Sequence, residues 1–98
     1  MNDDVLIATV LDEAALTVEQ VCAACGVSRD WIEQRVRAGL LAARGEAPAD
    51  WRFGGRDIRR VREMYRLECR FDAAPELAAL VVDLHEQIEA LRARLARE

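Results

Sequence analysis

Two helix signals on either side of a three-residue turn are the feature that most restricts the fold of this chain. Thr17 can cap a first helix, and Gln20 three residues later completes a capping box. Gly26 suits the left-handed position that ends a helix, and Ser28 can cap a second helix that ends at Gly39. Two short helices joined by a three-residue turn that contains glycine form a helix-turn-helix motif.

The first of these helices also contains a cysteine pair that could serve a different purpose. Cys22 and Cys25 have the spacing of a redox or metal-binding pair. A zinc site would need two further ligands, and the chain offers only Cys69 and His85, which fall in different predicted helices. We therefore interpret Cys22 and Cys25 as small packing residues on the inward face of the helix and expect no metal. The odd count of three cysteines argues against a disulfide framework and favours a reducing cytoplasm.

Other segments predict the elements that surround this motif. Residues 5–11 are rich in branched side chains and predict a strand, which we place at an edge. Residues 42–55 contain glycine and proline around Trp51 and Phe53, a pattern that predicts a β-ribbon wing whose two aromatic side chains pack on the core. A third, arginine-rich helix is expected, with Asp57 in its first turn, and should run to about residue 70.

The last third of the chain predicts a coiled-coil helix. After Pro75, a helix over residues 76–97 would be about 33 Å long at 1.5 Å per residue. Apolar residues recur along it in steps of four and three, which is the seam of a coiled coil. We expect the same helix of a second copy to cover this seam in a homodimer, the alternative being a helix that folds back on its own domain. The predicted dimerisation residues are Leu77, Val81, Leu84, Ile88, Leu91 and Leu95.

The predicted fold class is therefore mainly α: a winged helix-turn-helix with a small β-ribbon wing, followed by a C-terminal coiled-coil dimerisation helix. We expect the winged domain to cover residues 1–72 and the dimerisation helix to cover residues 73–98. The chain contains no run that approaches the roughly 18 apolar residues of a membrane span, so the expected location is the cytoplasm.

The charge pattern argues against DNA binding as the main activity. The net charge is −4, although proteins that bind DNA tightly are usually basic. The six arginines of residues 56–70 give that segment a charge of +3, whereas residues 28–38 reach only +1. Asp30 and Glu33 fall on the second helix, where contacts with bases and phosphates are normally made, and they would repel the DNA backbone.

The order of these elements resembles the MerR-like winged-helix architecture. More narrowly, the chain is similar to the chaperone modulatory proteins of the CbpM type. The matching segments are LTVEQVC (16–22), CGVS (25–28), WRF (51–53), DIRR (57–60) and DLHEQIEALR (83–92). The resemblance implies a non-catalytic protein that binds the J-domain of a DnaJ-like co-chaperone, CbpA, and inhibits its coupling to a DnaK-type chaperone. Through such a partner it could also associate with the nucleoid.

The chemistry of that partner indicates which surface to consider. A J-domain presents a basic helix beside its His-Pro-Asp loop, so its inhibitor should offer carboxylates with some apolar area. The exposed side of the second helix fits this description, and the N-terminal acids Asp12, Glu13 and Glu19 form a second acidic cluster. The predicted partner-binding residues are Asp30, Trp31, Glu33, Gln34 and Arg37.

Two other functions remain open at this level. The chain could be a small MerR-like transcription regulator that binds DNA, or an adaptor that uses the same dimer for another protein. An enzyme is poorly motivated, because the sole histidine, His85, lies in the coiled-coil helix and no nucleophile–base pair can be argued from spacing. We expect no catalytic residue and no cofactor. The arginines that motivate DNA binding are Arg37, Arg44, Arg52, Arg56 and Arg59.

Overall fold

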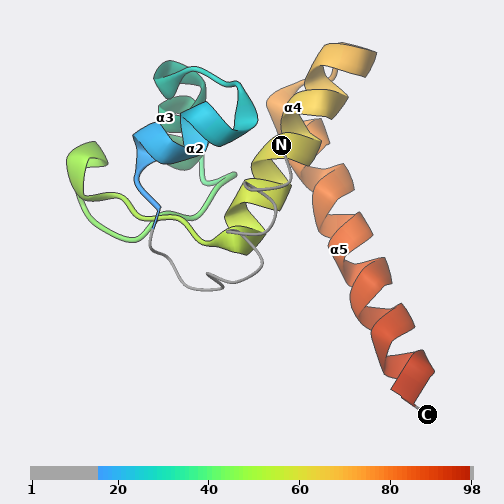
Figure 1. Ribbon diagram of the computed structural model, residues 1–98. Coiled ribbons are helices and arrows are strands. Elements are labelled where there is room, and N and C mark those ends of the chain that lie inside the picture. Colours follow the sequence, from blue (N-terminus) through green and yellow to red (C-terminus); the bar gives the residue numbers. More distant parts are fainter. Residues whose placement is uncertain (1–15, 98) are drawn as a thin grey trace. The chain divides into compact units, whose positions relative to one another are not determined.

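The computed structural model describes residues 16–97, so the strand predicted at residues 5–11 lies outside the described part (Figure 1). Its elements are α2 (Val18–Cys25), α3 (Arg29–Arg37), the 3-10 turn η1 (Pro48–Asp50), α4 (Gly55–Phe71) and α5 (Pro75–Arg97). The chain forms two compact units that divide between Arg62 and Glu63, within α4. The domain boundary predicted after residue 72 stays a prediction.

The helix-turn-helix at α2 and α3 is built by its local end signals, as the sequence predicts. The Gln20 N–H donates to the Thr17 hydroxyl at 3.1 Å, and the Thr17 N–H donates back to the Gln20 side chain at 2.8 Å. Gly26 adopts φ 71° after α2, a conformation that costs glycine little. The Ser28 hydroxyl accepts from the Trp31 N–H at 3.1 Å and so caps α3.

The core of the first unit collects apolar side chains from both of these helices, from the loop that follows and from the start of α4. The rings of Trp51 and Phe53 lie edge to face with their centroids 6.5 Å apart, a favourable aromatic geometry. Both aromatic residues predicted to pack on the core are buried. The other buried apolar residues of this unit are Leu16, Val18, Val21, Val27, Ile32, Leu41, Ile58 and Val61.

The predicted β-ribbon wing is wrong. Between residues 16 and 97 no strand is formed, and the only pairings are two isolated antiparallel bridges, Leu16–Phe53 and Arg44–Arg52. Arg44 and Arg52 exchange backbone hydrogen bonds of 3.2 and 2.9 Å. The chain between them turns through η1, where Pro48 has no N–H to donate to a ladder. The wing is therefore a loop closed by a single bridge, and we call residues 45–51 the wing loop.

Helix α4 begins at Gly55, so Asp57 lies in its first turn, as predicted. The Asp57 carboxylate accepts from the Gly54 N–H at 2.8 Å and so caps the first turn. Two arginines of α4 donate to backbone carbonyls near the ends of the preceding helices. Arg62 donates a hydrogen bond to the carbonyl of Ala24, and Arg60 donates one to the carbonyl of Leu40, each at 3.0 Å. Part of the arginine-rich segment therefore holds the first unit together.

Helix α5 of the second unit has one buried and one exposed apolar face. The small residues Ala78 and Ala79 are buried together with Val82. The six residues of the predicted seam are between 38% and 70% exposed, so the described part of the chain does not cover them. The backbone reverses into α5 through Asp72, which has a φ of 52°. Within residues 16–97, no helix combines the length and the apolar character needed to cross a membrane.

Candidate functional site

The predicted partner-binding surface on α3 is organised by a buried arginine. Arg35 is only 8% exposed, and its guanidinium lies 4.1 Å from the centre of the Trp31 ring. It also donates to the Trp31 carbonyl at 3.4 Å and to the Gln34 side chain at 3.3 Å. A guanidinium over an indole face is attracted by the ring electrons. Trp31 is therefore held in place, half-buried, with a cation over one face of its ring.

The two other arginines of α3 pair with nearby acids. Arg29 contacts Glu19 of α2 at 2.6 Å and Glu33 at 2.9 Å. The hydrogen bond that Arg29 donates to the Glu33 carboxylate is the main cause that raises the pKa of Arg29. Arg37 lies 3.8 Å from the other oxygen of Glu33. All three arginines of α3 therefore have partners within the protein.

Asp30 differs from the other charged residues of α3. Its side chain is exposed, and within residues 16–97 it has neither a hydrogen bond nor an ion pair. It lies in the first turn of the helix, where a negative charge is favourable. Next to Trp31, it places a free carboxylate beside an anchored aromatic side chain.

The other predicted acids are either paired with arginines or lie outside the described residues. Glu33 is half-buried and paired with two arginines, so its charge is largely compensated. Glu19 is engaged by Arg29, while Asp12 and Glu13 lie outside the described residues. Whether the predicted residues contact a partner stays a prediction.

Sequence reasoning missed the burial of Arg35. A tryptophan and an arginine four residues apart lie on the same side of a helix, and this spacing was a usable signal. From the sequence alone, Arg35 contributes only to the charge of +1 over residues 28–38.

The three cysteines lie in different surroundings. Cys22 and Cys25 are half-buried and Cys69 is exposed, and none of the three is in a disulfide; the Cys25 thiol donates to the Ile58 carbonyl at 3.9 Å. Burial is the main cause that raises the pKa of the Cys22 thiol, and the nearby Glu19 adds to it. A raised pKa keeps this thiol protonated and unreactive, which fits a packing role.

The sole histidine, His85, lies on α5 directly after Leu84 of the seam. His85 Nδ1 lies 2.8 Å from an oxygen of Glu63 on α4, and Nε2 lies 3.2 Å from an oxygen of Glu89 on α5. Both contacts belong to the second unit. The hydrogen bond to Glu63 is the largest of the causes that raise the pKa of His85.

Comparisons with known proteins agree with this architecture. The family described as MerR HTH family regulatory protein matches residues 16–97. The chaperone modulatory protein CbpM of Pseudomonas entomophila (strain L48) is 27% identical over 77 residues, which cover 79% of this chain and 76% of the relative. No solved structure matches the chain significantly.

Proposed function

Because the chain belongs to the MerR HTH family of regulatory proteins and is of the CbpM type, we propose that it modulates a chaperone system without catalysing a reaction. In this proposal it binds the J-domain of a DnaJ-like co-chaperone of the CbpA type. The bound J-domain can then no longer couple to a DnaK-type chaperone. The name of the relative supports the chaperone connection, and the surface of α3 supports the kind of contact.

The proposal rests mainly on which charged side chains of α3 are already paired within the protein. In a DNA-binding helix-turn-helix, the second helix offers free arginine or lysine side chains to bases and phosphates. Here Arg35 is buried over Trp31, and Arg29 and Arg37 are paired with Glu33. Within residues 16–97, the charged side chain of α3 that has no partner is the carboxylate of Asp30. Such a helix suits a basic protein surface better than a phosphate backbone.

We also propose that the functional form is a homodimer joined through α5. Its seam is exposed over the length of the helix, from Leu77 at 53% to Leu95 at 70%. A regular apolar seam of this kind is covered when two copies associate, because each side chain then packs between side chains of the partner helix.

A calorimetric titration of the chain with the J-domain of a CbpA-type co-chaperone from the same organism tests the proposed function. We expect Asp30→Arg to weaken binding by about tenfold or more, because it reverses a charge that faces the basic partner. Glu46→Arg is the matched control, since it makes the same change on an exposed residue of the wing loop. A wild-type chain that does not bind the J-domain would refute the function. Equal binding by wild type and Asp30→Arg would refute the placement of the site on α3.

One observation favours the alternative function, a DNA-binding regulator. Among the described residues, the guanidinium groups of Arg44, Arg56 and Arg59 have no hydrogen-bond or ion-pair partner. All three lie around the wing loop and the start of α4. A gel-shift titration at low salt distinguishes the functions, because phosphate contacts would give an affinity that falls steeply as salt is added.

A further inference from the structure

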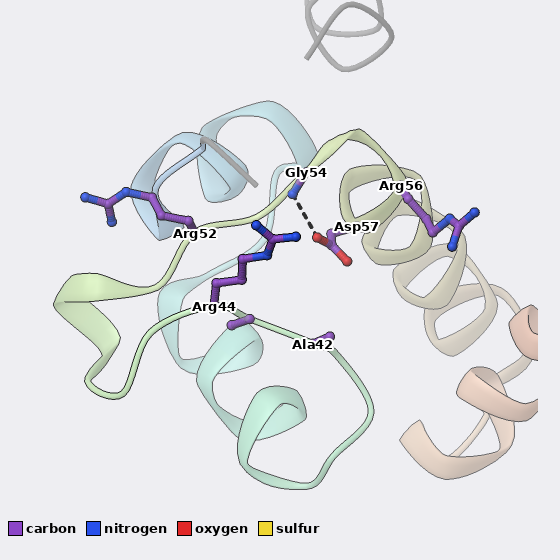
Figure 2. Close-up of a pocket in the computed structure, with 7 residues that line it drawn as sticks. Ala42, Arg44, Arg52, Gly54, Arg56 and Asp57 are labelled. Atoms are coloured by element: carbon purple, nitrogen blue, oxygen red, sulfur yellow. Dashed lines mark hydrogen bonds between the residues drawn. The ribbon is translucent and has the colours of Figure 1, made fainter. Parts of the chain in front are cut away.

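The first unit contains a cavity of about 370 Å³ between the chain around the Arg44–Arg52 bridge and the start of α4 (Figure 2). Its size is at the lower end of the range for small-ligand sites. We call it the arginine pocket. Six of the residues that line it are Ala42, Arg44, Arg52, Gly54, Arg56 and Asp57.

The charged side chains of the pocket differ in how they are engaged. Figure 2 shows the Arg44 side chain extending toward Gly54 and Asp57, while Arg52 and Arg56 extend outward on either side. The Arg52 guanidinium donates to the carbonyl of Trp51 at 2.8 Å. In the described part of the chain, those of Arg44 and Arg56 have no such partner.

The pocket is therefore electropositive. Its carboxylate, Asp57, already accepts from the Gly54 N–H at 2.8 Å. Three guanidinium groups against this one carboxylate leave the lining with an excess of positive charge. The first turn of α4 adds the positive end of a helix dipole to the same side.

We infer that the arginine pocket binds one carboxylate of an acidic side chain contributed by a protein partner. The planar guanidinium of Arg44 can bind both oxygens of a carboxylate, and such charge-assisted pairs are strong and directional. The small side chain of Ala42 and the backbone of Gly54 leave room for the group to enter.

A single acidic side chain fits this surface better than a nucleic acid does. A DNA backbone presents a dense row of negative charges, so it would approach the surrounding surface as well as the pocket. The wing loop, which begins directly after Arg44, carries the exposed acids Glu46 and Asp50, and these would repel a phosphate backbone. One carboxylate that enters the pocket need not approach them.

With the arginine pocket, the proposed complex has a positively charged contact in addition to the negatively charged contact at Asp30. Asp30 would face basic residues of the partner, and the arginine pocket would receive one of its acids. Two contacts of opposite sign fix the register of a complex better than one. The inference rests on the proposed function in taking the partner to be a protein.

Titration of the isotope-labelled full chain with sodium acetate, followed by NMR at constant ionic strength, tests the pocket directly. We expect saturable shifts of the Gly54 and Arg56 amides and of the Arg44 side-chain N–H. These shifts should be lost in Arg44→Gln and kept in Arg59→Gln, which removes an exposed arginine of α4 that does not line the pocket. Shifts that do not saturate, or that persist in Arg44→Gln, would overturn the inference.

Calorimetry with the J-domain then tests the protein partner. We expect Arg44→Gln to weaken binding by about tenfold and Arg59→Gln by no more than about twofold. Equal effects of the two variants would overturn the choice of an acidic side chain of a protein. The same conclusion would follow if a DNA duplex bound the wild type and this binding were lost in Arg44→Gln. If acetate saturates the pocket while the wild type binds no J-domain, the proposed function fails and the pocket is supported.

Discussion

At the scale of single residues, the chemistry of His85 is set by two carboxylates. Each ring nitrogen lies within hydrogen-bond distance of a carboxylate oxygen, Glu63 on α4 and Glu89 on α5. A neutral imidazole has one donor and one acceptor, whereas the imidazolium has two donors. The protonated form therefore satisfies both contacts, which agrees with the raised pKa of His85.

We expect the second unit to be more stable at mildly acidic pH because of this histidine. The folded-state pKa lies above the ordinary value of 6.5, so the stabilisation is complete below about pH 6.5. It is lost as the pH rises through the higher folded-state value. An NMR titration of the only histidine ring should give a pKa above 6.5 that falls in Glu63→Gln.

The control for this titration is Glu76→Gln, which changes an exposed acid in the first turn of α5. It should leave the pKa of His85 unchanged. A wild-type pKa at or below 6.5 would contradict the prediction, since it would mean that the two carboxylates do not hold the proton in solution.

Residue-level burial was the hardest property to predict from the sequence. The helical spacing in α3 predicts an inward stripe of Ile32 and Val36 with help from Trp31. Ile32 is fully buried, and the other two are half-buried. The spacing does not predict Arg35 as a buried residue, because an arginine at that depth depends on the ring of Trp31 and on nearby acceptors. The same limit applies to the arginine pocket, whose lining residues come from separate stretches of the chain.

At the scale of elements, helices were predictable because their end signals are local. The capping box at Thr17, the glycine at position 26 and the cap at Ser28 each act within a few residues, and the structure confirms all of them. The wing was not predictable in this way. Phe53 pairs with Leu16, whereas Arg52 pairs with Arg44, so neighbouring residues bridge to two different segments. Alternating side chains cannot distinguish this arrangement from a two-stranded ribbon.

The exposed seam of α5 leads to a prediction about assembly. Ile88→Asp should convert the proposed homodimer to a monomer, because it would place a charge in the middle of an apolar interface. Ala90→Asp is the matched control, since position 90 is exposed on the same helix and lies outside the seam. Sedimentation equilibrium should show a monomer for the first variant and a dimer for the second. A dimer in both would place the interface elsewhere.

At the scale of the whole molecule, the charges are unevenly distributed along the chain. The net charge is −4, yet the segment 56–70 carries six of the 14 arginines. A partner with its own basic and acidic regions would therefore be oriented before contact, since fields of this kind act over about 10 Å at 0.1 M salt.

We therefore expect the association rate with the J-domain to fall by about tenfold or more between 50 and 500 mM salt, with a much smaller change in the dissociation rate. Stopped-flow mixing at several salt concentrations measures both rates. Asp30→Asn should show a shallower dependence, because it removes one of the charges that attract the partner. An association rate that does not respond to salt would contradict this prediction.

The unequal surroundings of the two tryptophans give the protein a built-in optical reporter. Trp51 is 5% exposed in the core, so its emission should follow unfolding. Trp31 is half-buried on the surface of α3 with the Arg35 cation over its ring, so its emission should respond to any molecule that covers α3. With Trp51→Phe, the remaining tryptophan fluorescence would come from Trp31 on the proposed contact surface alone. Binding there could then be followed in real time without an attached dye.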